Sequence, residues 1–255
     1  MIRARGAEAG RRGLLVSTDG RGDAAALFGR PDQGYQESEL APGLFGQTFE
    51  FEPLLEDFVR TIAPVGFVAS RILASATFRY FTRATPGLAD LLLLGKLREH
   101  VRAKKRPYDL VVVDAPATGH AVALLSMPRI VRDTIPGGPM RHVAEDLDAI
   151  LSDRARSRLV VVAEPAELAA REAEELVDAA REKAGLAAAL LVVNRVGRSG
   201  RAGTLPRGAL PLVRVPELDV PHPASGSPFA PDEAFFGAFR RALAGSPPPR
   251  TRERP

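Results

Sequence analysis

Asp114 stands where an apolar, β-branched run, "LVVVD", comes to an end. A carboxylate at the tip of a buried strand is costly unless something satisfies it. A hydrated Mg²⁺ carrying nucleotide phosphates would satisfy it. Capping of the following helix would satisfy it equally well. The residue pattern leaves both interpretations open.

Asp19 ends a second run of the same kind, "LLVSTD", and is followed by glycines at positions 20 and 22. If the two runs form neighbouring strands, they place two carboxylates at one site. One carboxylate could then serve the coordination shell of a metal, and the other could orient or deprotonate an attacking water. An ordinary Asp-Gly turn is the alternative, and this stretch taken alone favours it.

The elements that would position these acids are short apolar runs separated by helical patterns. The runs are continuous rather than alternating, which is typical of strands buried on both faces. Strand and helix alternate along the chain, which predicts a mostly parallel sheet with helices on both faces. The expected strands lie at 13–19, 109–116, 158–165, 189–196 and, more weakly, 210–218, and the clearest helix at 167–185.

The stretch between the first two strands is longer than one crossover needs. Residues 50–105 contain "FEPLLEDFVRTI", "GFVASRILASATFRYF" and "PGLADLLLLGKLREHVRAKK", which predict a helical insertion. The polar, proline-rich end at 245–255 predicts a disordered tail. We therefore expect one α/β domain over 1–244.

Composition excludes several classes of protein. The 255 residues include no cysteine, so disulfides and thiolate metal sites are excluded. The formal charge of +4 comes from scattered basic residues and does not predict nucleic-acid binding. No apolar run reaches the roughly 20 residues of a membrane helix. The N-terminus lacks an apolar signal core, so a cytoplasmic protein is expected.

Several segments together resemble the anion-transporting ATPase family, which includes the arsenical pump-driving ATPase and the ATPase that targets tail-anchored membrane proteins. The resemblance spans about residues 12 to 220. It rests on "LLVSTD" with "ALFG", "PGLADLLLLGKL", "YDLVVVDAPATGHAVALLSMP", "EPAEL" and "LLVVNRV". It implies a P-loop NTPase-like fold, ATP and Mg²⁺ as cofactors, and ATP hydrolysis as the activity.

The resemblance also implies roles for particular residues. Asp19 matches the switch I aspartate that acts on the attacking water, and Asp114 matches the one that contacts Mg²⁺ through water. The remaining implied nucleotide-site residues are three from the switch II segment and three that surround adenine: Thr118, Gly119, His120, Asn194, Pro216 and Glu217. The sequence departs from the family at "STDG", where members have "STDP", and at "DAPATGH", where the proline is displaced.

The phosphate-binding loop of the family, "GKGGVGKT", has no counterpart in this sequence. The fragment "LLLLGKLRE" lacks the first glycine and the hydroxyl, and it lies in a helical pattern. In the family, the strand before that loop is central and lies beside the one ending at Asp114. We therefore expect a P-loop NTPase-like fold whose first strand and phosphate loop are missing, from an N-terminally truncated ATPase.

Two alternatives remain. One is a catalytically dead pseudo-ATPase that pairs with a paralogue, and the other is a partitioning-type ATPase, which the "TGH" segment and the long insertion disfavour.

The resemblance implies a homodimer, or a heterodimer with a paralogue, and a pump or membrane-protein client as partner. Without cysteine, neither thiolate binding of arsenite nor the zinc site of the targeting branch is expected. Residues 50–105 correspond to the client-binding helical subdomain, or they are core helices that pack on the sheet.

Overall fold

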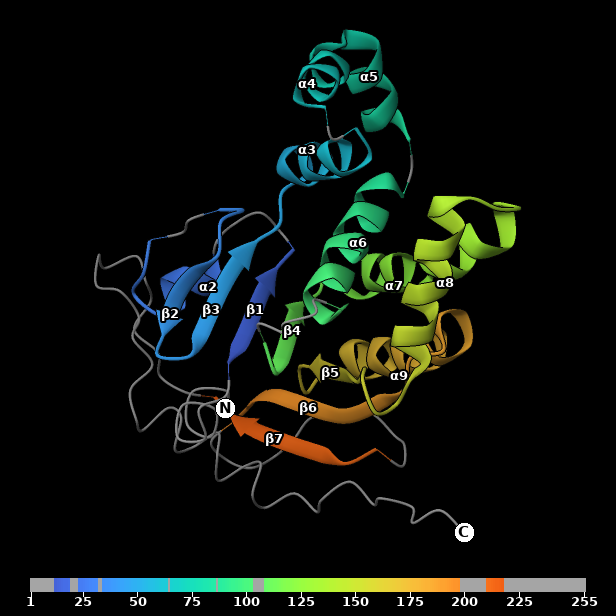
Figure 1. Cartoon of the computed structure of the whole chain (residues 1–255). Coiled ribbons are helices and arrows are strands. Elements are labelled where there is room, and N and C mark those ends of the chain that lie inside the picture. The colour runs from blue at the N-terminus through green and yellow to red at the C-terminus, as the bar shows by residue number, and fades with distance from the viewer. Residues whose placement is uncertain are drawn as a thin grey trace. The chain divides into compact units, whose positions relative to one another are not determined.

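The computed structural model describes residues 12–18, 23–31, 34–63, 65–85, 87–102, 108–197 and 210–217. The chain forms two compact units, one up to Ala117 and one from Thr118 onward. Each unit contains its own sheet with helices packed on it (Figure 1). The predicted α/β class with mostly parallel strands is confirmed.

The sheet of the first unit, sheet A, is built around its first strand. Its order is β2-β3-β1-β4, and β1 is parallel to both β3 and β4, whereas β2 and β3 are antiparallel. The strands are β1 (Gly13–Ser17), β2 (Ser38–Ala41), β3 (Leu44–Thr48) and β4 (Leu110–Asp114). Leu14 and Val16 of β1 are completely buried, as their continuous apolar run predicts.

Helices cover both faces of sheet A. The short helix α2 (Asp23–Leu27) lies on one face, where its Ala25 packs in a cluster with Leu40, Ala41 and Leu44. The opposite face meets α6 (Leu88–Arg102), whose His100 contacts Gln47 of β3. Because successive strand residues point to opposite faces, the even and odd positions of β3 serve these two layers.

The β2–β3 hairpin was not predicted from sequence. Its apolar residues form two very short groups separated by Pro42 and Gly43, so no run was long enough to identify a strand. Gly43 has φ 73°, the left-handed conformation that such a turn requires. A Cβ at Gly46 would lie 2.7 Å from a methyl of Leu40, so the two strands approach too closely for any side chain there.

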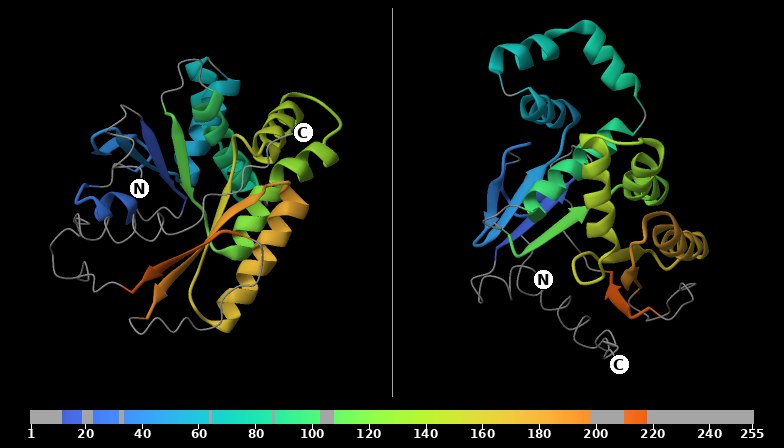
Figure 2. Two further views of the ribbon diagram at one scale, coloured as in Figure 1. Left: turned by 90° about the horizontal axis from the view of Figure 1, so that it is seen from below. Right: turned by 45° about the vertical axis from the view of Figure 1, so that its right-hand side comes forward.

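The predicted helical insertion is confirmed, with four helices over its described residues. They are α3 (Phe51–Ile62), α4 (Gly66–Ala74), α5 (Ala76–Ala84) and α6. The expected helix over "GFVASRILASATFRYF" is divided at Ser75, whose side chain accepts a hydrogen bond from the Phe78 N–H and caps α5. Figure 2 shows α4 and α5 extending beyond α3, at the end farthest from sheet A.

The second unit contains sheet B, in which every strand pair is parallel. Its order is β5-β6-β7, with β5 (Leu159–Ala163), β6 (Ala188–Val196) and β7 (Leu212–Pro216). Helix α9 (Glu167–Ala184) packs one face through Ala173, in a cluster with Val161 and Leu191. The helices α7 (Thr118–Thr134) and α8 (Pro139–Ser152) pack together, and α7 also packs against α9.

Helix α9 ends as its sequence predicts. Gly185 follows the last helical residue with φ 67°, and its N–H bonds back to the Arg181 carbonyl. A Cβ at Gly185 would lie 2.3 Å from a guanidinium nitrogen of Arg129 and 2.7 Å from the Ser152 hydroxyl. Arg129 also donates to the Glu182 carbonyl at 3.1 Å, so the end of α9 is tied to α7.

We predict that Gly185→Ala lowers the free energy of unfolding by about 1–2 kcal/mol or more, because an L residue is strained in the left-handed region. Displacement of the Arg129 guanidinium would add to that loss. Gly95→Ala in α6 is the matched control, since its Cβ would meet nothing within 4 Å. Alanine should stabilise that helix by up to about 1 kcal/mol. Urea unfolding of both variants checks this, and equal effects would contradict it.

Candidate functional site

The ends of β1 and β4 meet at one edge of sheet A, as the two acid-terminated runs predict. Ser17 pairs in register with Asp114, and the Thr18 hydroxyl donates a 2.7 Å hydrogen bond to the Asp114 carbonyl oxygen. On the other side of β1, the Phe49 N–H donates to the Ser17 carbonyl at 2.9 Å. Asp19 lies outside the described residues, so the structure does not report on its position.

The Asp114 side chain is exposed at this strand end, which suits a contact with a hydrated cation. Mg²⁺ keeps several of its waters and takes one or two carboxylates together with substrate phosphates. Asp114 therefore fits a water-mediated role and not a complete protein cage. Among the described residues, no group of three or more His, Asp or Glu side chains could hold a metal.

The predicted switch II residues lie at the start of α7, in the second unit. Thr118 is the first helical residue and is half-buried, whereas Gly119 and His120 are exposed. Asp114 belongs to the other unit. Exposed polar groups in the first turn of a long helix can contact an anion, because the helix leaves backbone N–H groups unpaired there.

The three residues predicted to surround adenine lie at the carboxyl edge of sheet B. Val196, two residues after Asn194, pairs with Pro216, and the Glu217 N–H donates to the Val196 carbonyl at 2.9 Å. Asn194 is half-buried, and Pro216 and Glu217 are exposed. Ligands of parallel α/β sheets bind at this edge, so the pairing of β6 with β7 is compatible with the predicted roles.

Sequence reasoning missed a polar cluster between α3, α6 and the loop before β2. The Lys96 ammonium donates to Asp57 at 2.6 Å and lies 3.2 Å from Glu99, and the Tyr35 hydroxyl donates to Asp57 at 2.6 Å. Burial lowers the pKa of Lys96, but the hydrogen bond to Asp57 and the interactions with Glu99 and Tyr35 together outweigh burial and raise that pKa. Burial and the bond to Asp57 together raise the pKa of Tyr35.

His100, one turn further along α6, continues this cluster inside the first unit. Gln47 donates its amide N–H to the Tyr35 carbonyl at 2.8 Å, which leaves its Oε1 to accept from His100 Nε2 at 3.0 Å. The neutral ring therefore carries its proton on Nε2. Its Nδ1 faces Glu37 at 3.7 Å, and Glu37 also accepts a hydrogen bond from the Tyr108 hydroxyl.

Burial is the chief cause that lowers the pKa of His100, and the nearby Lys96 charge lowers it further. The negative charges of Glu37 and Glu99 act in the opposite direction but do not cancel this effect. No short motif links these positions, because Lys96 and Asp57 are 39 residues apart. The available signal was the group of charged residues in the second half of α6, and it also fits a solvated helix face.

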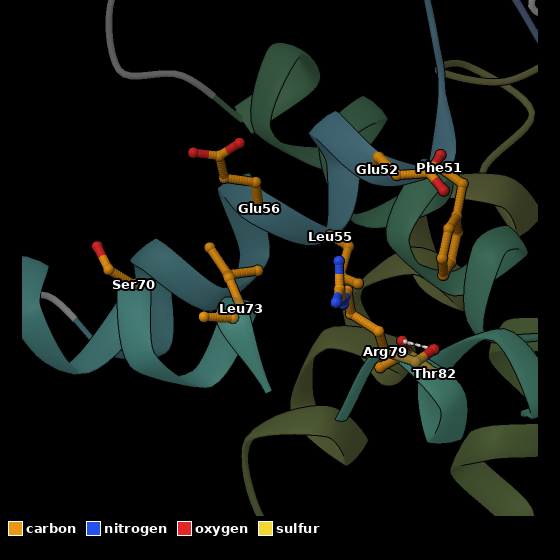
Figure 3. Close-up of a pocket in the computed structure, with 9 residues that line it drawn as sticks. Phe51, Glu52, Leu55, Glu56, Ser70, Leu73, Arg79 and Thr82 are labelled. Atoms are coloured by element: carbon orange, nitrogen blue, oxygen red, sulfur yellow. Dashed lines mark hydrogen bonds between the residues drawn. The ribbon is translucent and has the colours of Figure 1, made fainter. Parts of the chain in front are cut away.

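The tip of the helical insertion is apolar and hollowed. A cavity of about 420 Å³ lies between three helices, and Figure 3 shows Leu55 and Leu73 among the side chains that line it. Glu52 and Glu56 of α3 and Arg79 of α5 supply its charged groups.

Large apolar side chains near this cavity are exposed to solvent, with Phe67 at 73% and Tyr80 at 78%. The others in this region are Ile62, Val65 and Val68. These residues of α3–α5 do not pack on the sheet, as ordinary core helices would.

Comparison with known proteins identifies the class. A sequence model of the family described as anion-transporting ATPase matches residues 4–136, just over half of the chain. The chain belongs to the anion-transporting ATPase family, which confirms the resemblance noted in its sequence. Within the described residues, no helix is both long and apolar enough to cross a membrane.

Two relatives illustrate the match. ATPase BagA of Mycobacterium tuberculosis strain H37Rv is 31% identical over 168 residues, which cover 62% of this chain and 49% of the relative. "Putative arsenical pump-driving ATPase 2" of Aquifex aeolicus is 27% identical over 128 residues, covering 48% and 41% respectively. The chain thus spans about half the length of the curated relatives it matches.

We predict that His100 makes stability fall as the pH falls below about 6.5, the ordinary pKa of histidine. Below that pH the unfolded chain takes up a proton that the buried ring resists, until the pH reaches the lowered pKa of the folded state. His100→Gln keeps an amide donor for Gln47 but does not titrate. Urea unfolding between pH 7 and pH 5 should therefore show a smaller pH dependence in His100→Gln. Identical dependence in both proteins would contradict the assignment.

Proposed function

We propose that this chain is part of an ATPase that couples ATP binding and hydrolysis to a conformational change. The reaction is transfer of the γ-phosphoryl group to water, and the bound Mg²⁺ would neutralise charge on the β and γ phosphates. Asp19 orients the attacking water and accepts its proton. Asp114 accepts hydrogen bonds from the water shell of the ion, and Asn194, Pro216 and Glu217 surround the base.

The open edge of sheet A is the observation that carries this proposal. Among the described residues, β4 has a single sheet neighbour, β1, although its sequence "LVVVD" is that of a strand buried on both faces. Leu110 is half exposed, and the three valines are only partly buried. A parallel strand alongside β4 would bury these side chains and satisfy the backbone groups of that edge.

Sheet B supports the same interpretation independently. Its edge strand β5 exposes Val160 by 50% and Val162 by 62%, whereas Val161 and Ala163 are buried against the cluster on α9. We propose that the 255-residue sequence is the C-terminal part of a longer ATPase. Its additional strand pairs with β4 and leads into the glycine-rich loop that holds the phosphates.

The mass of the protein made by its natural host tests this proposal. We expect an intact mass well above 27.3 kDa, with peptides that contain a glycine-rich loop ending in Lys and Thr or Ser. A native mass of 27.3 kDa would overturn it. The chain would then act as a pseudo-ATPase that pairs with a paralogue and relies on the phosphate loop of that partner.

We predict that Asp19→Asn and Asp114→Asn each slow ATP hydrolysis by the host-made protein by at least about 100-fold. A positioned base such as Asp19 typically contributes that much, and loss of the Asp114 charge would weaken the hold on the hydrated Mg²⁺ that neutralises the phosphates. Asp109→Asn is the matched control at the other end of β4. Its carboxylate accepts from the Arg12 N–H at 2.8 Å, and an amide oxygen can replace it there. Steady-state phosphate release measures all three, and full activity of Asp114→Asn would contradict the role given to Asp114.

The partner belongs to the same proposal. The exposed apolar side chains at the tip of the insertion and the cavity beside them support an apolar segment of a membrane-protein client rather than a soluble anion as cargo. The family resemblance supports a homodimer, or a heterodimer with a paralogue, in the cytoplasm. In such an assembly, movement of the switch residues would be transmitted to α3 through the adjoining ends of β1 and β3.

A further inference from the structure

Strand β6 carries an irregularity next to Asn194. Val193 pairs with Arg214 and Val196 pairs with Pro216, so two residues of β6 lie opposite the single residue between their partners on β7. The second of the two, Arg195, has φ 57° and is the one non-glycine residue with positive φ in the described part of the chain. Bulges and left-handed residues of this kind are concentrated at functional sites, where they redirect side chains.

Interactions on both sides hold this conformation. The Arg195 guanidinium forms a 3.0 Å ion pair with Glu164, which follows β5 directly. On the other side, Val196 is buried, and its carbonyl accepts from the Glu217 N–H. The Arg195 side chain is therefore held beside the end of β5, whereas the backbone after Arg195 pairs with β7. Asn194, half-buried, lies between these two attachments.

We infer that Arg195 and Glu164 are positioning residues that hold the Asn194 amide for recognition of a purine base. This inference rests on the proposed function, in which Asn194 contacts adenine. An asparagine amide offers a donor and an acceptor side by side, which match the paired groups on the edge of adenine. Two simultaneous hydrogen bonds require a fixed amide position. The bulge sets that position, and the ion pair keeps the bulge in place.

The experiment compares base preference in the protein as its host makes it, measured as the ratio of the Kd values for Mg·GDP and Mg·ADP. Arg195→Gly keeps the left-handed backbone accessible but removes the guanidinium, and Glu164→Gln weakens the ion pair without altering β6. Both should reduce the preference for ADP by about fivefold or more, since loss of one base contact is worth that much. Isothermal titration calorimetry supplies the Kd values for both nucleotides in the wild-type protein and in each variant.

A second exposed ion pair provides the matched control. Glu167→Gln removes the pair with Arg171, which has the same chemistry but lies on α9. The Glu167→Gln variant should leave the ratio of the Kd values for Mg·GDP and Mg·ADP unchanged. A preference for ADP that persists in both Arg195→Gly and Glu164→Gln would overturn this inference alone. Absence of any preference in the wild-type protein, or of nucleotide binding, would overturn the proposed adenine site as well.

Discussion

The parallel pairing of β1 with both β3 and β4 is the constraint on which the first unit depends. It places Ser17 beside Thr48 on one side and beside Asp114 on the other. The chain leaves β3 after Thr48 and enters α3 at Phe51. The insertion therefore begins beside the end of β1, and the proposed switch segment also begins at the end of β1. A displacement of the end of β1 would therefore move both neighbouring strand ends together.

The polar cluster on α6 gives the insertion a second attachment to the sheet. Lys96 joins α6 to α3 through Asp57, and His100 joins α6 to β3 through Gln47. Partly buried charges need good partners to be stable, and here each has at least one charged or hydrogen-bonding neighbour. Such a cluster specifies one arrangement of the helices more sharply than apolar contacts alone, because a shifted helix would leave a charge without its partner.

Much of this architecture was predictable, because long β-branched runs leave few alternatives. The ends of the five expected strands lie within two residues of their predicted positions, and α9 ends at the glycine that marked it. The β2–β3 hairpin and the division at Ser75 were not predicted, since both depend on short segments whose structure tertiary packing decides. The placement of Asn194, Pro216 and Glu217 at the same end of sheet B follows from the pairing of β6 with β7, which no local pattern reveals. The ion pair of Arg195 with Glu164 likewise joins residues 31 positions apart.

The partly exposed apolar side chains of β4 and β5 have a consequence for handling the 255-residue chain in the laboratory. An apolar strand with unpaired backbone groups along one side is a template for any other extended chain, including a second copy of itself. Recovery after refolding should therefore decline as the protein concentration rises. Association of this kind would have no fixed stoichiometry, so light scattering would distinguish it from association through a symmetric subunit interface.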